Sequence, residues 1–328
     1  MNKENLLKST ILFSLLAVLM LLLPVLQYFS SQQQFAYATT LSDFSFGTAG
    51  DWSSKTSALN TATNMKNHGV VKAIGIGDYA YLTGTSAVDS WWKNEMYPVH
   101  GIWKGSEGNH DTQDSAEYLK LFGQSSWVFS FNYQNVHFLS LDTEISYGVG
   151  SSQYNFVKND LASASTNTAI NWIIAFFHRP IYTSPSVHAP LAAFRDVYHP
   201  LFDKYHVDLV LQGHNHNYQR SYPLLYNSNS PSNPTITTKN TTNYSNPNGE
   251  IYMVVGTGGQ TSYAFNAQAA YIVKQFTNTF GFLDIDIINN GSTLKGTFFS
   301  DGGVIKDQFT ITKYIGTSVT PFLLALPV

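Results

Sequence analysis

The sequence predicts an α/β fold, because short apolar strand-like runs alternate with helix-like segments over most of its 328 residues. Hydrophobic residues make up 43% of the chain and charged residues 12%, a balance typical of a folded chain with a full core. In the final third, strand-like runs are joined by Asn-Gly and Asp-Gly-Gly turns, which favour antiparallel pairing. We therefore expect an α/β fold whose last third suggests a second, more antiparallel sheet.

Runs rich in β-branched and aromatic residues predict the strands. In chain order they cover residues 44–47, 70–76, 98–103, 136–141, 172–177, 207–211, 251–255, 281–288, 293–299 and 304–311. Helix-like segments lie between the earlier strands, over residues 54–67, 112–122, 153–165 and 188–205. The stretch 226–249 is dominated by Asn, Ser, Thr and Pro and is expected to be a loop.

Residues 1–38 have the features of an export signal. Lys3 and Lys8 precede an apolar run over residues 11–26, and Ala36-Tyr37-Ala38 supplies a signal-peptidase pattern. An uncleaved membrane anchor is the alternative, because about 20 apolar residues span a bilayer. Pro24 interrupts the run and favours cleavage. Both interpretations place the rest of the chain outside the cytoplasm, either secreted or at the cell surface, and contact with a membrane is expected only for an uncleaved signal.

One catalytic domain is expected over residues 39–316, followed by an apolar tail over 317–328. The net charge of −3 gives no broad basic surface, so we expect no nucleic acid as a bulk partner. The chain has no cysteine, which excludes disulfides, thiolate ligands and a cysteine nucleophile. Any metal would therefore be bound by imidazole, carboxylate, amide or phenolate groups.

Candidate metal ligands come shortly after predicted strands. They are Asp51, Asp78, Asn109, His178, His214 and His216. In α/β sheets, ligand sites assemble in loops beyond the carboxyl ends of strands, so these five loops are expected to converge. Each residue also has an ordinary alternative: Asp as a helix cap, Asn as a turn former and His as a core residue. Three histidines that end apolar strands in one chain favour a metal site.

The spacing indicates two ions. His214 and His216 are two residues apart, so in an extended segment their side chains start roughly 6 to 7 Å apart and suit adjacent metals. A carboxylate can bridge two metals held about 3.5–4 Å apart, and Asp78 is the bridging candidate. The ligands then divide into a harder set, Asp51, Asp78, Tyr81 and His216, and a borderline set, Asp78, Asn109, His178 and His214. The phenolate set favours Fe(III), and the other set suits Fe(II), Zn or Mn.

The segments around these residues resemble the ordered blocks of purple acid phosphatases, which belong to the calcineurin-like metallophosphoesterases. The blocks are Gly-Asp-Trp-Ser at 50–53, Gly-Asp-Tyr-Ala-Tyr at 77–81, Gly-Asn-His-Asp at 108–111, the strand that ends at His178, and Gly-His-Asn-His at 213–216. The resemblance covers roughly residues 43–313. It implies a four-layer α/β/β/α sandwich with two mixed sheets, a mixed-valence di-iron centre or iron with zinc or manganese, and phosphomonoester hydrolysis.

Some positions distinguish this chain within the resemblance. The wider superfamily usually carries Asp-x-His in the first block, whereas here Trp52 and Ser53 follow Asp51 and the Tyr81 phenol is expected to replace the histidine. Plant members carry Asp at the position of Thr83, which leaves open what orients His110.

The expected reaction is hydrolysis of a small phosphorylated substrate by in-line attack of a metal-bound hydroxide. His110 and His188 are the candidate acids for the leaving group, although His188 could simply begin a helix. Arg179 and Arg220 could bind phosphate or form structural ion pairs. Substrate choice is assigned to the loops at 83–92, 183–189 and 226–249. Alternative functions are a phosphodiesterase or nucleotide pyrophosphatase on the same metal core, and a non-catalytic surface binding module.

Overall fold

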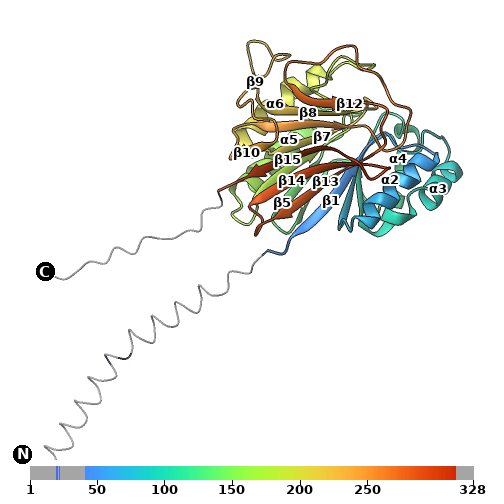
Figure 1. Cartoon of the computed structure of the whole chain (residues 1–328), viewed down its shortest axis with the longest axis horizontal. Coiled ribbons are helices and arrows are strands. Elements are labelled where there is room, and N and C mark those ends of the chain that lie inside the picture. Colours follow the sequence, from blue (N-terminus) through green and yellow to red (C-terminus); the bar gives the residue numbers. More distant parts are fainter. Residues whose placement is uncertain (1–19, 21, 23–40, 315–328) are drawn as a thin grey trace, which may run out of the picture. The chain divides into compact units, whose positions relative to one another are not determined.

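Two mixed β-sheets form the centre of the domain, and helices cover the outer face of each sheet (Figure 1). The computed structural model describes residues 20, 22 and 41–314. Apart from residues 20 and 22, the predicted signal or anchor at 1–38 lies outside the described residues, as does the predicted tail at 317–328. Within the described part of the chain, no helix has the length and apolar character needed to cross a membrane.

The first sheet has the strand order β10-β15-β14-β13-β1-β2-β3. Its strands are β1 (Phe44–Ala49), β2 (Lys72–Ile76), β3 (Trp103–Ser106), β10 (Asn243–Ser245), β13 (Gly281–Ile288), β14 (Thr293–Ser300) and β15 (Ile305–Thr312). Strands β1, β2 and β3 are parallel, whereas β1 pairs with β13 in antiparallel register. The antiparallel strands of the last third therefore extend the amino-terminal sheet and do not form a sheet of their own.

The second sheet has the strand order β12-β8-β11-β7-β6-β5-β4, with β9 paired to β8. Its strands are β4 (Phe129–Tyr133), β5 (Val136–Ser140), β6 (Trp172–Phe176), β7 (Leu209–Gln212), β8 (Tyr218–Leu225), β9 (Thr235–Ile236), β11 (Glu250–Val255) and β12 (Ile272–Phe276). Strands β5, β6, β7 and β11 are parallel to one another. Their carboxyl ends consequently meet at one edge of the sheet.

The helices complete four layers. Helices α2 (Thr56–Asn67), α3 (Thr85–Asn94) and α4 (Ser115–Phe122) pack on the first sheet, and α5 (Ser152–Thr166) and α6 (Ala192–Tyr205) pack on the second. Two short 3-10 helices, η1 (Tyr97–Ile102) and η2 (Thr112–Asp114), lie between β2 and α4 in the chain. The predicted α/β/β/α sandwich with two mixed sheets is confirmed.

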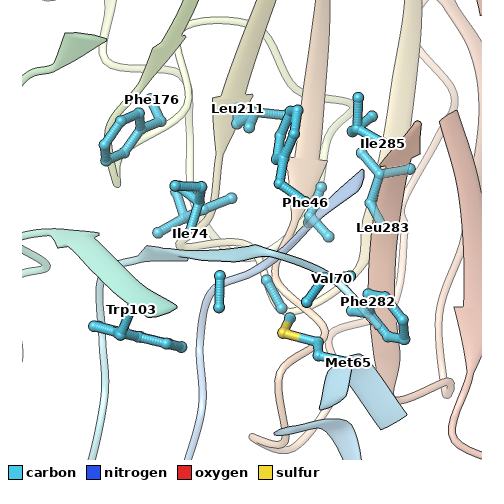
Figure 2. Packing of buried hydrophobic residues seen from close by; sticks show 14 of the residues in the cluster. Phe46, Met65, Val70, Ile74, Trp103, Phe176, Leu211, Phe282, Leu283 and Ile285 are labelled. Carbon is cyan, nitrogen blue, oxygen red and sulfur yellow. The ribbon is translucent and has the colours of Figure 1, made fainter. Parts of the chain in front are cut away.

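Alternation along the strands builds the core between the sheets (Figure 2). Phe46 and Ile74 point from the first sheet toward Phe176 and Leu211 of the second, while Trp103 lies on the helix-covered side. All four residues between the sheets are fully buried. Removing such a side chain from water contributes about 1.5–3 kcal/mol to folding, so this layer holds the two sheets face to face.

Some local predictions differ from the structure. The strand predicted at 98–103 is the 3-10 helix η1, because Pro98 has no N–H for a strand ladder and suits the first helical turn. The substrate loop predicted at 83–92 is largely helix α3, whose Val88, Trp91 and Trp92 are buried at helical spacing. Helix α6 begins at Ala192, not at His188. Strands β4, β8 and β12 were not predicted from the sequence, and the predicted loop at 226–249 contains the short strands β9 and β10.

Arg220 joins the two sheets through a buried ion pair. From β8 it donates to Asp307 of β15 through Nε (2.6 Å) and Nη2 (2.9 Å), and its Nη1 donates to the Tyr244 hydroxyl (2.8 Å). Tyr218 donates to the same carboxylate at 2.8 Å. Of the two roles predicted for Arg220, phosphate binding or a structural ion pair, the structure shows the ion pair. Arg179 likewise forms a bidentate pair with Glu144, at 2.7 and 2.8 Å.

We predict that Asp307→Ala destabilises the protein by about 3–5 kcal/mol, because it leaves the Arg220 guanidinium buried without its counter-charge. Denaturant unfolding monitored by circular dichroism measures the change. Lys120→Gln is the control, since it removes only the ion pair that this exposed lysine makes with Glu117 and should leave the midpoint unchanged. Equal midpoints for Asp307→Ala and wild type would show that this pair does not hold the sheets together.

Candidate metal centre

The predicted polar residues lie in loops at the carboxyl ends of strands from both sheets. Asp51 follows β1, Asp78 and Tyr81 follow β2, Asn109 follows β3, His178 follows β6, and His214 and His216 follow β7. Backbone hydrogen bonds tie the loops to one another. Asp51 N donates to Gly77 O (3.1 Å), and Gly213 N donates to His178 O (2.8 Å).

The loops are so close that two glycines are required for steric reasons. A Cβ on Gly108 would overlap the backbone nitrogen of Asp78, and one on Gly213 would lie 2.8 Å from Asp51 Oδ2. Four candidate ligands themselves have left-handed backbones: Asp51 (φ 56°), Asp78 (φ 53°), Tyr81 (φ 55°) and His214 (φ 68°). This conformation is uncommon for residues other than glycine and persists only where the surroundings impose it.

The Tyr81 hydroxyl is the centre of one group of donors. It donates to Asp78 Oδ2 (3.1 Å) and lies 2.9 Å from His216 Nε2 and 3.4 Å from Asp51 Oδ1. His216 Nε2 is also 3.4 Å from Asp51 Oδ1. Asp51, His216 and one oxygen of Asp78 thus gather around the Tyr81 hydroxyl.

A second group shares the same oxygen. His178 Nε2 lies 3.2 Å from Asp78 Oδ2 and 3.2 Å from His214 Nδ1. The ligand atoms of Asp78, His178 and His214 all lie within 4.8 Å of one another. Asp78 therefore belongs to both groups, which is the arrangement expected for a bridging carboxylate.

Carbonyl groups fix the orientation of two histidine rings. His178 Nδ1 donates to Ile76 O (2.8 Å), and His216 Nδ1 donates to Thr261 O (2.8 Å). Because a carbonyl only accepts, Nδ1 carries a proton in both rings, and the neutral form of each ring presents the Nε2 lone pair to the cluster. Such a bond on the far ring nitrogen is typical of histidines that bind metals.

Burial and charge determine the protonation of the cluster. Burial raises the pKa of Asp51 to about 8, against the opposing charge of His178. Burial also acts to raise the pKa of Asp78, but the charge and hydrogen bond of His178 outweigh it and hold that pKa below its usual value. Burial lowers the pKa of His214 to about 2 and that of His216 to about 4. Burial acts to lower the pKa of His178, but the charge and hydrogen bond of Asp78 outweigh it and raise that pKa to about 10. His214 and His216 are therefore neutral ligands beside an ionised Asp78, and a cation at the cluster would take the place of the His178 proton.

The remaining predicted residues border this cluster. Asn109 Oδ1 is buried and has no hydrogen-bond partner within the described residues. His110 is exposed, its ring lies 4.6 Å from that of Tyr81, and its backbone N–H donates to Asp78 Oδ1 (2.9 Å). Ring contact with Tyr81 therefore orients His110. The His188 ring stacks on His214 at 3.9 Å, and burial lowers the pKa of His188.

Two residues at the site were not assigned roles from the sequence. The Asp111 carboxylate accepts backbone hydrogen bonds from Asp78 (2.7 Å), Gly108 (2.8 Å) and Tyr79 (2.9 Å). Its place in the Gly-Asn-His-Asp block was the available signal. Tyr263 stacks on His216 at 3.9 Å, but no local pattern marks it.

The donor set fits two metal ions. The oxygen donors are the carboxylates, the Tyr81 phenol and the Asn109 amide. Imidazole nitrogens such as His178 Nε2 complete the set. Oxygen ligands suit hard cations, and nitrogen ligands suit borderline cations. The unpartnered Asn109 Oδ1 and the ring nitrogens of His178 and His214, which face each other at 3.2 Å, are groups that a cation would satisfy.

Residues 50–218 match the calcineurin-like phosphoesterase family, and the chain belongs to that family. Proteins named purple acid phosphatases are among its relatives. It is 28% identical over 240 residues to the Arabidopsis thaliana protein named probable inactive purple acid phosphatase 1, covering 71% of this chain and 38% of that protein. It is 28% identical over 290 residues to a Hordeum vulgare nucleotide pyrophosphatase/phosphodiesterase, covering 77% of this chain and 76% of the relative.

A solved structure shares the fold. The purple acid phosphatase from yellow lupin (Lupinus luteus) seeds superposes with a TM-score of 0.72 at 22% identity, covering 83% of this chain and 54% of the lupin chain. The family's binuclear metal centre agrees with the candidate residues gathered around Asp78.

We predict that Asp111→Asn lowers the free energy of unfolding by about 1–3 kcal/mol, because an amide nitrogen would face backbone N–H donors that the carboxylate now satisfies. Thermal unfolding measures the change. Asp114→Asn, in the same loop, is the control, since its carboxylate accepts an exposed hydrogen bond from Gly84. An Asp111→Asn variant as stable as the control would contradict a role for this carboxylate in holding the Asp78 loop.

Proposed function

We propose that this chain hydrolyses phosphate monoesters with two metal ions bound by Asp51, Asp78, Tyr81, Asn109, His178, His214 and His216. The observation that carries the proposal is the position of Asp78, whose Oδ2 lies 3.1 Å from the Tyr81 hydroxyl and 3.2 Å from His178 Nε2. A carboxylate shared by two groups of donors suits a pair of adjacent ions. Membership of the phosphoesterase family supports the reaction class.

The proposed metals are Fe(III) with Asp51, Asp78, Tyr81 and His216, and Fe(II), Zn or Mn with Asp78, Asn109, His178 and His214. When bound, such ions lower the pKa of coordinated water and neutralise charge on phosphoryl oxygens. The chain supplies their separation through the rigid, strained loops around Asp78.

His110 is the proposed acid for the leaving oxygen. Its side chain is exposed, in contact with the Tyr81 ring and next to the Asp78 loop, so it can reach a substrate bound at the cluster. His188 is the second candidate. Asn215 fixes its backbone through hydrogen bonds of 3.0 and 2.9 Å, which holds the ring over His214.

The leaving group has space beside His188. A cavity of about 500 Å³ is lined there by residues 183–190 together with Gln268, Ala269 and Tyr271. This supports the proposed role of the 183–189 loop in substrate choice. The stretch 226–249 joins the end of β8 to the start of β11. These strand ends lie away from the cluster, so we do not propose a role in substrate choice for this stretch.

A phosphodiesterase or nucleotide pyrophosphatase is the second candidate function, favoured by the barley relative, which matches over 76% of its length. Turnover of an aryl phosphate and a bis-aryl phosphate by the metal-loaded protein separates the two. Turnover of neither substrate by fully loaded protein would support the non-catalytic alternative. Export remains a proposal that rests on residues 1–38; mass spectrometry of exported protein tests cleavage after Ala38.

We predict a visible absorption band from charge transfer between the Tyr81 phenolate and Fe(III), and its loss in Tyr81→Phe. Metal analysis of the same sample gives the ion content, and Tyr263→Phe is the control, because that ring stacks on His216 but is not a proposed ligand. A loaded, oxidised and active protein without the band would remove Tyr81 from the ligand set.

We predict that His110→Ala keeps both metals and slows hydrolysis of alkyl phosphates by about a hundredfold or more, the usual contribution of a positioned acid. The loss should shrink for aryl phosphates with acidic leaving groups, which need no proton. Steady-state rates across a leaving-group series measure this dependence. An equal loss for all leaving groups, or loss of metal, would rule out His110 as the acid and make His188 the leading candidate.

A further inference from the structure

A second group of metal-ligating side chains lies at the other end of the second sheet. Helix α6 supplies His199 and Asp203, one helical turn apart, and Glu250 is the first residue of β11. Strand β11 runs parallel to β7, whose far end leads to His214. The group is therefore separated from the candidate metal centre by the length of these strands.

The three side chains converge on one point. His199 Nε2 lies 3.2 Å from Asp203 Oδ1 and 3.3 Å from Glu250 Oε2. Their ligand atoms all fall within 4.8 Å of one another. His199 and Glu250 are 0% and 1% exposed, whereas the Asp203 side chain retains 22% exposure.

These buried groups lack aligned hydrogen bonds. Neither His199 Nε2, nor Asp203 Oδ1, nor either carboxylate oxygen of Glu250 has a hydrogen-bond partner among residues 41–314. Leaving a buried polar group unpaired costs about 1–3 kcal/mol, and a charged group costs more. The Glu250 carboxylate, nine-tenths or more buried and aimed at His199, is thus the independent sign of a missing partner.

The orientation of the His199 ring places Nδ1 next to Tyr182 and Nε2 next to the two carboxylates. The Tyr182 hydroxyl lies 2.8 Å from His199 Nδ1 and in donor geometry to Pro231 O (3.2 Å). When it donates to Pro231 O, it accepts from His199 Nδ1. With the proton on Nδ1, the neutral ring directs the Nε2 lone pair at two carboxylate oxygens. Three acceptors facing one another repel unless a proton or a metal cation lies between them.

A cavity gives an ion access to the group. It has a volume of about 500 Å³ and is lined by Asp203 and Glu250 together with Asp208, Asn248 and Lys313. Lys313 is paired with Asp208 at 2.6 Å, so its charge is already compensated. Water from the cavity could complete the coordination of an ion held by three protein ligands.

We propose that His199, Asp203 and Glu250 bind a divalent cation, Zn²⁺ or Mn²⁺, through one imidazole nitrogen and two carboxylate oxygens. The nitrogen ligand distinguishes this set from the all-oxygen sites of Ca²⁺ and Mg²⁺. The ion fastens α6 to β11. Both elements support the candidate metal centre, since α6 follows the His188 loop and β11 leads into the backbone that hydrogen-bonds with Gly50.

The test is a count of bound ions. Chelator-stripped protein is reloaded with Zn²⁺, desalted and analysed for metal per chain. Glu250→Gln should bind one ion fewer than wild type, while its aryl phosphate turnover, measured after loading, stays within about twofold of wild type. Asp160→Asn is the matched control, because it alters a His–Asp pair, with His137 at 2.7 Å, that has no third ligand among the residues the structure describes. It should bind as many ions as wild type.

Asp203→Asn provides a second variant for the case that Glu250→Gln does not fold, because Asp203 is partly exposed. It should also lose one ion, together with the part of the Zn²⁺-dependent rise in Tm that this site contributes. Because the result is a difference between wild type and variant, it does not depend on whether the protein hydrolyses phosphate esters. Equal ion counts in wild type and the folded variants would overturn the proposal and identify His199 as a protonated ring held between two carboxylates.

Discussion

The Asp78 carboxylate is the contact on which the candidate site depends. One of its oxygens accepts from the His110 backbone, and the other faces Tyr81 and His178. The backbone of Asp78 is left-handed, and its N–H donates to the Asp111 carboxylate. Position 108 must be glycine, because a Cβ there would overlap the Asp78 nitrogen. The negative charge at the centre of the cluster is therefore fixed by the backbone of two loops as well as by side-chain contacts.

The two sheets determine where that charge lies. Because parallel strands end at the same edge, the face-to-face packing of Phe46 and Ile74 against the second sheet brings loops from both sheets together. The buried Arg220–Asp307 pair joins the sheets at a second place. A shift between the sheets would move Asp51 and Asp78 relative to His178 and His214, so packing far from the cluster controls the geometry of the ligands.

Apolar runs predicted strands β2, β5, β6 and β7 closely, and polar residues after these runs marked several side chains that lie together near Asp78. Their role as metal ligands stays a prediction. The pairing of β1 with β13 could not be predicted, because local periodicity does not encode contacts between distant segments. The run that contains Pro98 is apolar, so it was predicted to be a strand. The segment with Trp91 and Trp92 was predicted to be a loop and is helix α3. Asp111, Tyr263 and the His199 group become visible only when the chain is folded, because their partners come from other loops and strands.

The order of assembly follows from how far apart these partners are in the chain. The Ser53 hydroxyl donates to the carbonyl of Gly259, 206 residues away, and Gly50 donates to Val255. During synthesis, the loop that carries Asp51 is made long before Val255 and Gly259, the partners of its neighbours Gly50 and Ser53. Closing such long loops is entropically costly and is repaid only when the sheets pack. A fragment that ends before Val255 lacks the contacts that hold the Asp51 loop against β11 and the Gly259 segment.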